Sequence, residues 1–201
     1  MGEPIVEWLN QQQDNMVELL RDLVDIDSNS FDKAGVDRVG ARLTAFFDDN
    51  EIPHETIPLE EYGNAIRAVV SGGDGNQPIL LCGHRDTVFP TGEVEKRPFS
   101  IADGKAFGPG VADMKPGLVI NAFILAAFHK FGGHPNPLVG LFTGDEEIGS
   151  PTSQDVITAE AEKARLAFNS EPSRPSGNIV TRRKGGIFCR CEISGVAAHS
   201  G

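Results

Sequence analysis

Three short apolar runs constrain the fold of this sequence more than any other feature. They are PILLCG at residues 78–83, PLVGLFT at 137–143 and RLAFN at 165–169. Such runs are typical of strands buried on both faces of a parallel or mixed sheet. Because stretches with helical patterns alternate with these runs, we expect an α/β fold, a three-layer sandwich in which helices flank a largely parallel mixed sheet.

The remaining segments fit this architecture. Apolar spacing and composition predict helices over 5–26, 36–50, 117–131 and 151–164. Strands are expected over 54–59, 64–72, 178–183 and 186–195, the last two as a sheet or hairpin at a solvated margin. Residues 84–115 form one long predicted loop, and loops longer than ~12–15 residues are usually functional or disordered.

The composition argues against several classes of protein. The chain has 18 basic and 29 acidic residues, a net charge of −11, and an isoelectric point near 4.8. Nucleic acids and anionic membranes attract basic surfaces, so neither is expected as a partner. No stretch reaches the ~18 apolar residues of a membrane span, and the N-terminus lacks the pattern of a secretion signal. Three cysteines are too few for a disulfide framework, so we expect reduced thiols in a cytoplasmic protein.

Acidic and imidazole side chains follow the ends of the apolar runs. In α/β sheets, ligands bind beyond the carboxyl ends of the strands, so these side chains are expected to meet in one crevice. The candidates are His84 and Asp86 after the first run, Asp145, Glu146 and Glu147 after the second, Glu171 after the third, and Asp113 just before helix 117–131.

This combination of residue types predicts a metal site. Carboxylates gathered in a crevice raise one another's pKa, and burying each charge is costly, unless a cation lies between them. Imidazole with carboxylates is the ligand set of catalytic zinc, manganese or cobalt, and one carboxylate can bridge two ions ~3.5–4 Å apart. Calcium is a weaker alternative because His84 is a poor ligand for it. Any one of these acids alone is more often a solvated loop residue, and their conjunction is what favours a metal.

Two further roles follow from spacing. Glu146 and Glu147 are adjacent and point in different directions, so one is expected to bind metal while the other acts as general base on water. Asp86, two residues after His84, is placed to accept the far ring N–H of that imidazole.

The order of the motifs resembles a known family. The segments GHRDTVFPTGEVEKRPFSIADGKAFGPGVADMKPG, LFTGDEEIGS, FNSEPS and GVAAHSG resemble the M20 family of dinuclear zinc peptidases and deacylases, most of all its glutamate carboxypeptidase branch. The match runs from about residue 78 to 201, and the first 77 residues agree in pattern only. The resemblance implies a zinc-peptidase-like α/β catalytic domain followed by an α+β lid or dimerisation domain.

The resemblance also assigns the metal ligands. It implies two divalent ions, zinc in the first place and cobalt or manganese as alternatives. His84 and Glu171 would bind one ion, Glu147 would bind the other, and Asp113 would bridge them. It further implies a cis peptide bond between Asp113 and Met114.

Three catalytic roles are implied in the same way. Glu146 would be the general base, and Asp86 would orient His84. His199, in the motif AAHSG, would reach the site from the lid, in dimeric members from the partner subunit, and stabilise the oxyanion.

Members of this family are longer than this sequence and carry a final metal-binding histidine near the C-terminus. We therefore expect residues 1–184 to be an incomplete catalytic metal-binding domain and residues 185–201 the first strand of a truncated lid. In this form the chain is expected to bind metal weakly and to have little or no activity, and the full-length form is expected to be a homodimer.

The function implied is metal-dependent cleavage of an amide bond in a small peptide or N-acyl amino acid, as in glutamate carboxypeptidases. One alternative is a deacylase similar to acetylornithine deacetylase or succinyl-diaminopimelate desuccinylase. Another is a truncated, non-catalytic binding or assembly module, against which the intact Glu146 argues.

Overall fold

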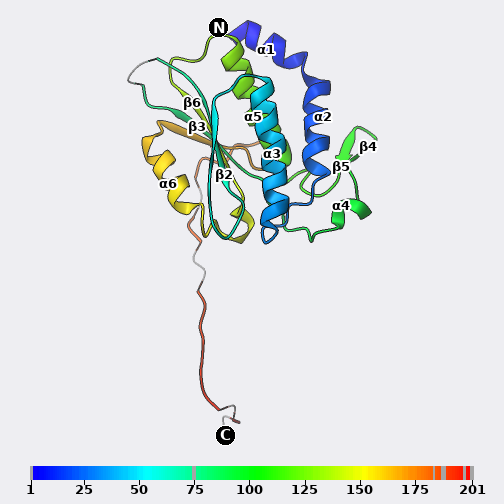
Figure 1. The fold of residues 1–201 in the computed structure, drawn as a ribbon, viewed down its shortest axis with the longest axis vertical. Helices are drawn as coiled ribbons and strands as arrows, with labels where there is room; N and C mark the ends of the chain where they lie inside the picture. Colours follow the sequence, from blue (N-terminus) through cyan, green and yellow to red (C-terminus); the bar gives the residue numbers. More distant parts are fainter. Residues whose placement is uncertain (1, 74–75, 183, 187–188, 197, 200–201) are drawn as a thin grey trace.

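A computed structural model describes residues 2–73, 76–182, 184–186, 189–196 and 198–199 (Figure 1). The α-helices are α1 (Gly2–Asn10), α2 (Gln13–Val24), α3 (Lys33–Asp49), α4 (Glu93–Lys96), α5 (Lys115–Lys130) and α6 (Gln154–Lys163), with a 3₁₀ turn η1 (Glu146–Ile148). The strands are β1 (His54–Ile57), β2 (Ala65–Val70), β3 (Ile79–His84), β4 (Ser100–Ala102), β5 (Lys105–Phe107), β6 (Leu138–Thr143) and β7 (Leu166–Asn169).

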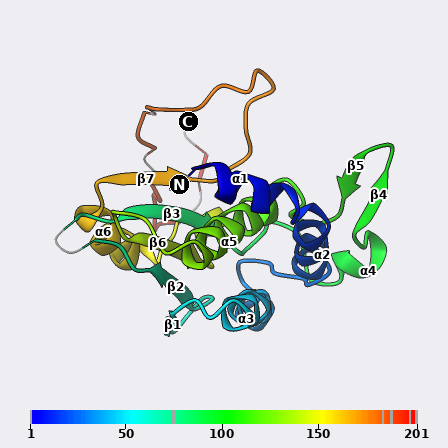
Figure 2. The ribbon, with the colours of Figure 1, turned by 90° about the horizontal axis from the view of Figure 1, so that it is seen from above.

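Five of the strands form one mixed sheet in the order β1-β2-β6-β3-β7. Strands β6, β3 and β7 are parallel, whereas β1 and β2 pair antiparallel to each other and β2 pairs antiparallel to β6. Figure 2 shows β7 at one edge of this sheet and β1 at the other. The predicted α/β sandwich with a mixed sheet is confirmed.

Helices cover the two faces of the sheet unequally. Helices α1, α2, α3 and α5 lie on one face and α6 lies on the other (Figure 1). The first face holds the main apolar core, in which Leu43, Phe47 and Phe142 are fully buried. On the α6 face the buried apolar side chains of the cluster are Leu80, Val139 and Leu141.

Helix α5 joins the core to the polar edge of the sheet. It is apolar around most of its circumference, and Pro116 lies in its first turn, where a missing N–H costs no hydrogen bond. It begins two residues after Asp113, with Met114 between them, so the position of the buried helix restricts where that carboxylate lies.

The predicted helix over 5–26 is in fact two helices. The chain turns at Gln11 and Gln12, within a polar stretch, and both α1 and α2 contact α5. The predicted loop 84–115 likewise contains short elements, namely α4 and the β4–β5 hairpin.

The prediction that residues 165–169 form a strand buried on both faces is wrong on burial. The strand exists, but Leu166 and Phe168 are 51% and 54% exposed. Strand β7 is the last strand in the sheet order and has a neighbour only on its β3 side among the described strands. Edge position therefore overrides the apolar composition.

The strands predicted over 178–183 and 186–195 are not formed by the described residues in those ranges. After Asn169 the described chain has no helix or strand, and its C-terminal part, beyond the residues that contact the site, runs away from the folded body (Figure 1). A strand requires a neighbour to pair its backbone N–H and C=O groups, and the described residues of these two ranges pair with none of the strands. Residues 183, 187 and 188 lie outside the described residues.

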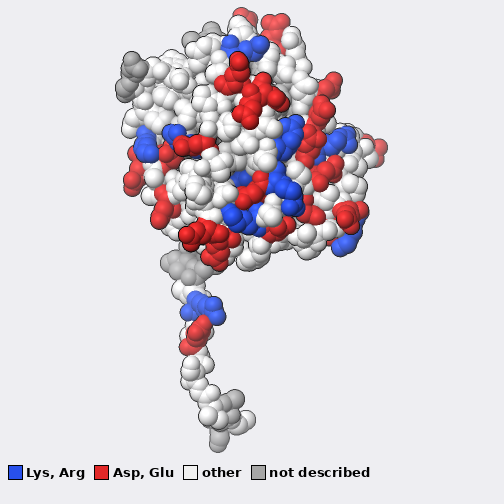
Figure 3. Space-filling model, in the orientation of Figure 1, with Lys and Arg blue, Asp and Glu red and all other residues white. Residues whose placement is uncertain are grey.

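Two surface properties bear on partners. On the face drawn in Figure 3, Lys and Arg are interspersed with Asp and Glu, without an extended basic area. Within the described part of the chain, no helix combines the length and apolar character needed to traverse a bilayer.

Candidate metal centre

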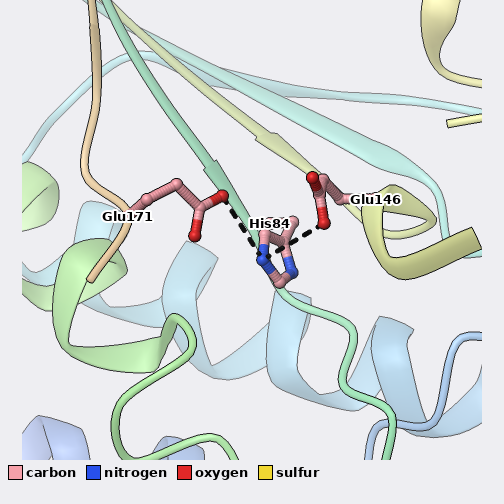
Figure 4. Close-up of side chains that lie close together, drawn as sticks. All are labelled: His84, Glu146 and Glu171. Carbon is pink, nitrogen blue, oxygen red and sulfur yellow. Dashed lines mark ion pairs between the residues drawn. The ribbon is translucent and has the colours of Figure 1, made fainter. Parts of the chain in front are cut away.

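The polar residues at or just after the carboxyl ends of the three parallel strands lie together at one end of the sheet. His84 ends β3, Glu146 lies just after β6, and Glu171 lies two residues beyond β7. The His84 imidazole Nε2 lies 3.7 Å from Glu146 Oε2 and 3.6 Å from Glu171 Oε1 (Figure 4). Asp113 joins them from the turn before α5, with its Oδ1 3.2 Å from the same nitrogen.

These side chains fall into two groups that share the imidazole. His84, Glu146 and Glu171 form one group, and His84, Asp113 and Glu147 form the other. Within each group, one ligand atom per residue lies within 4.8 Å of the others, which is close enough to hold an ion. The geometry therefore brings every predicted ligand together, and it places both Glu146 and Glu147 near the imidazole rather than separating ligand from base.

The imidazole of His84 is held on its far side. It is 1% exposed, and its Nδ1 lies 3.0 Å from the backbone oxygen of Asp86 and 3.3 Å from the Asp86 carboxylate. The backbone N–H of His84 donates to the thioether sulfur of Met114 at 3.2 Å. With Nδ1 engaged by Asp86, Nε2 faces the carboxylates, as a metal ligand requires.

Asp86 also contacts the turn after β6. It is fully buried and accepts the backbone N–H groups of Glu146 at 3.2 Å and Glu147 at 3.1 Å. It also accepts the hydroxyl of Ser30 at 2.7 Å. One carboxylate thus connects the segment after β3 with the turn after β6, a link that the sequence spacing did not reveal.

Asp145 has a structural position that differs from that of its two neighbours. It is buried, and its carboxylate accepts from the backbone and hydroxyl groups of Thr152 and Ser153. These bonds tie the end of β6 to the start of α6. Of the three consecutive acidic residues, Asp145 therefore holds β6 and α6 together, whereas the carboxylates of Glu146 and Glu147 face the cluster.

Asn121 positions the segment that carries Glu171. This buried amide on α5 donates to the Cys82 carbonyl at 3.0 Å and accepts from the Ser170 hydroxyl at 2.7 Å. Gly117, one turn earlier on α5, lies so close to the Ser170 carbonyl that a Cβ would collide with it. Sequence reasoning missed Asn121, since one polar residue in a buried helix gives no sign of its partners.

The turn before α5 is fixed as tightly. The peptide bond between Asp113 and Met114 is cis, as the resemblance implied. Lys115 is 1% exposed and donates to the Ile26 carbonyl at 2.9 Å. Burial lowers its pKa to about 8, against the opposing charges of Asp27 and Asp25.

Charges within the cluster perturb one another. Burial lowers the pKa of the His84 imidazole, but hydrogen bonds to Asp86 and Glu171 and the charge of Glu146 raise it more, to about 11. Burial and neighbouring carboxylates raise the pKa of both Glu146 and Glu147, although His84 opposes the shift. Several carboxylates crowded together in this way are stabilised by a positive charge between them, which a divalent cation supplies.

A cavity of about 170 Å³ adjoins the cluster. Cys82, Leu141 and Ile157 line its apolar part, and His84, Glu146 and Glu171 are among the residues at its polar end. The centre is therefore accessible from the α6 face of the sheet.

His199 is not part of this cluster. Its side chain is exposed, and it lies on the C-terminal segment that runs away from the folded body. The structure thus brings together six of the seven predicted site residues and leaves His199 apart, so the role of His199 stays a prediction.

An α/β sheet with an imidazole and carboxylates gathered where its parallel strands end defines a candidate metalloprotein. The model of peptidase family M20/M25/M40 matches residues 80–198, and the chain belongs to this family.

Individual relatives agree with this assignment. Carboxypeptidase G2 from Pseudomonas sp. (strain RS-16) is 29% identical over 195 residues, which cover 94% of this chain and 46% of the relative. Human carnosine dipeptidase 1 has a TM-score of 0.73 at 17% identity, over 87% of this chain and 42% of its own. The Saccharomyces cerevisiae di-peptidase Dug1p has a TM-score of 0.69 at 18% identity, over 84% and 40%. The chain thus spans about half the length of these relatives, and the two structural likenesses show the fold alone.

Proposed function

We propose that this chain is the metal-binding part of a hydrolase that cleaves an amide bond in a small peptide or N-acyl amino acid. One observation carries the proposal: His84 Nε2 lies within 3.2–3.7 Å of carboxylate oxygens from three separate segments. In the proposed organisation, residues 1–184 are the catalytic domain and residues 185–201 begin a lid. A homodimer in the cytoplasm belongs to the same proposal.

The donor set fits two divalent ions, zinc in the first place. His84 and Glu171 would hold one ion, Glu147 the other, and Asp113 would bridge them. The Nε2 atom of the buried imidazole faces three carboxylates, and the pKa values of Glu146 and Glu147 are raised. Both observations support this fit, because crowded carboxylates are stabilised by positive charge. When bound, such ions would polarise the scissile carbonyl and acidify water at the site.

The chain's own residues would then move the protons. Glu146, 49% exposed at its side chain and beside His84, would accept a proton from the attacking water and return it to the leaving amine. Asp86 would keep the imidazole in the tautomer that leaves Nε2 unprotonated for the ion. His199 would approach with the lid and stabilise the oxyanion.

For substrate, the proposal is a carboxypeptidase-like amide with a free carboxylate beside the scissile bond. Its support is the 29% identity to a protein named as a carboxypeptidase. A panel of dipeptides and N-acyl amino acids, assayed with the zinc- and cobalt-loaded whole protein, tests this choice. Preference for acetylated or succinylated amino acids would favour a deacylase instead.

Glu146→Gln tests the mechanism. In the metal-loaded whole protein we expect kcat to fall about 10²–10⁴-fold, the usual contribution of a general base, while metal binding is retained. Glu162→Gln, at an exposed position of α6, is the matched control and should leave kcat unchanged. Unchanged turnover in Glu146→Gln would contradict the assignment of the base.

A further inference from the structure

We propose that Ser30 is a positioning residue of the metal centre, acting through the Asp86 carboxylate. The inference rests on the proposed function and deepens it, because it concerns a residue outside the motifs that suggest metal binding. Ser30 lies 54 positions before His84 in the chain, in the connection between α2 and α3.

The Ser30 hydroxyl is held in place independently of the bond it makes. The side chain is 2% exposed, and the backbone around it runs beside the residues that follow β3. Ser30 N donates to the Thr87 carbonyl at 3.3 Å, and Thr87 N donates to the Ser28 carbonyl at 2.8 Å. The hydroxyl therefore meets Asp86 from a fixed backbone.

Both oxygens of Asp86 are committed to the centre. Oδ2 accepts the Ser30 hydroxyl at 2.7 Å and the Glu147 N–H at 3.1 Å. Oδ1 accepts the Glu146 N–H at 3.2 Å and faces His84 Nδ1 at 3.3 Å. A rotation of this carboxylate would shift the imidazole and the glutamate turn together.

Ser30 restrains that rotation. Its hydroxyl is the side-chain donor to Oδ2, and its bond is shorter than either backbone bond to the carboxylate. Because Asp86 is fully buried, bulk water does not replace a lost donor. Removing the hydroxyl should therefore loosen the preorganised ligands and weaken metal binding, whereas the apolar core, formed elsewhere, keeps the fold.

The chain offers a matched control two residues away. Ser28 is also 2% exposed and lies in the same connection, but its hydroxyl has no hydrogen-bond partner among the described residues. Ser28→Ala and Ser30→Ala thus remove the same atom at the same burial, and only the second removes a bond to Asp86.

The test is titration of the metal-free chain with Co²⁺ and Zn²⁺, followed by calorimetry and by the visible spectrum of the cobalt form. Ser30→Ala is expected to weaken binding about 10-fold, the low end of effects seen when a residue supporting a metal ligand is lost, and to alter the cobalt spectrum. Ser28→Ala is expected to stay within about twofold of the wild type, since no bond is lost.

A second pair of variants separates positioning from folding. Ser30→Thr keeps the hydroxyl. Ser30→Val has nearly the same volume as Ser30→Thr but carries a methyl group in place of the hydroxyl. We expect Thr to bind metal more tightly than Val and to restore the wild-type cobalt spectrum. Equal binding by Ser30→Ala and Ser28→Ala, or by Thr and Val, would overturn the inference. If the wild-type chain itself bound neither metal, the proposed function would fail instead.

Discussion

The two faces of the sheet differ in how much apolar surface they bury. The face under α1, α2, α3 and α5 packs a large continuous core, whereas the face under α6 buries a few side chains beside the Arg67–Glu160 ion pair at 3.1 Å. Strand pleating assigns residues to these faces: Leu81 points into the main core, and Leu80 and Cys82 point toward α6. His84 follows the same alternation, so the imidazole belongs to the thinly covered face.

This difference predicts that the face with the main core determines the stability of the fold, whereas the α6 face gives access to the candidate site. The main core buries many more apolar side chains than the α6 face, which leaves a cavity beside the candidate metal ligands. Substitutions on the two faces should therefore lower the free energy of unfolding by different amounts.

The largest loss is expected from Phe47→Ala on the main core face. Phe47 is fully buried, and its ring lies 6.1 Å from that of Phe46 and 5.7 Å from that of Phe142. We expect the free energy of unfolding to fall by about 3–5 kcal/mol because a large cavity is left. Urea denaturation checks this value, and a loss below about 1 kcal/mol would mean that this core does not carry the fold.

A smaller loss is expected from Ile157→Ala on the α6 face. Ile157 is only partly buried and lines the cavity beside the candidate centre. We expect the free energy of unfolding to fall by about 1–2 kcal/mol, in proportion to the buried apolar area that is lost. A loss equal to that of Phe47→Ala under the same conditions would remove the proposed difference between the faces.

Glu160→Gln should lower the free energy of unfolding by about 1 kcal/mol at pH 7, because the buried side chain keeps a hydrogen-bonding oxygen but loses the charge that pairs with Arg67 and Lys163. Burial raises the pKa of Glu160, but hydrogen bonds from Lys163 and Arg67 lower it more, so the pKa lies below its usual range. A carboxylate with a lowered pKa stabilises the fold fully above its unfolded pKa of ~4.3, and this contribution is lost as the pH falls through the lower folded value.

The difference between wild type and Glu160→Gln should therefore be constant from pH 7 to about 5 and then shrink toward pH 3. Thermal denaturation across this range measures it. A difference that grew on acidification would show that the sign of the pKa shift is wrong.

The smallest loss is expected from Phe168→Ala at the exposed edge. The Phe168 side chain is 54% exposed on β7, so its removal should change the free energy of unfolding by about 0.5 kcal/mol or less. Chemical denaturation beside the Phe47→Ala variant measures both on one scale. A loss of several kcal/mol would indicate that β7 is covered in solution.

Sequence patterns predicted those helices and strands whose burial follows directly from a run of apolar residues. The runs containing Leu80 and Leu141 are buried strands, and the long apolar helix 117–131 corresponds to α5. The burial of β7 could not be predicted in this way, because the order of strands depends on pairings that no local pattern encodes. The break at Gln11–Gln12 was likewise not predicted from the apolar spacing.

The residues of the candidate site likewise fall into those that the sequence predicted and those that it did not. His84, Asp113, Glu147 and Glu171 were identified because they follow apolar runs or fit a known motif, and the structure brings them together. Ser30 and Asn121 were missed because their role depends on a partner more than 35 residues away in sequence. Such hydrogen bonds become visible only in three dimensions.

The most direct test of the central claim is calorimetric titration of the chain with zinc, comparing the wild type with Asp113→Ala. Asp113 lies 3.2 Å from His84 Nε2 and belongs to one of the two candidate ligand groups. The account predicts site-specific zinc binding by the wild type and at least about 100-fold weaker binding by the variant. Identical titrations for the two proteins would contradict the existence of a metal centre at this edge of the sheet.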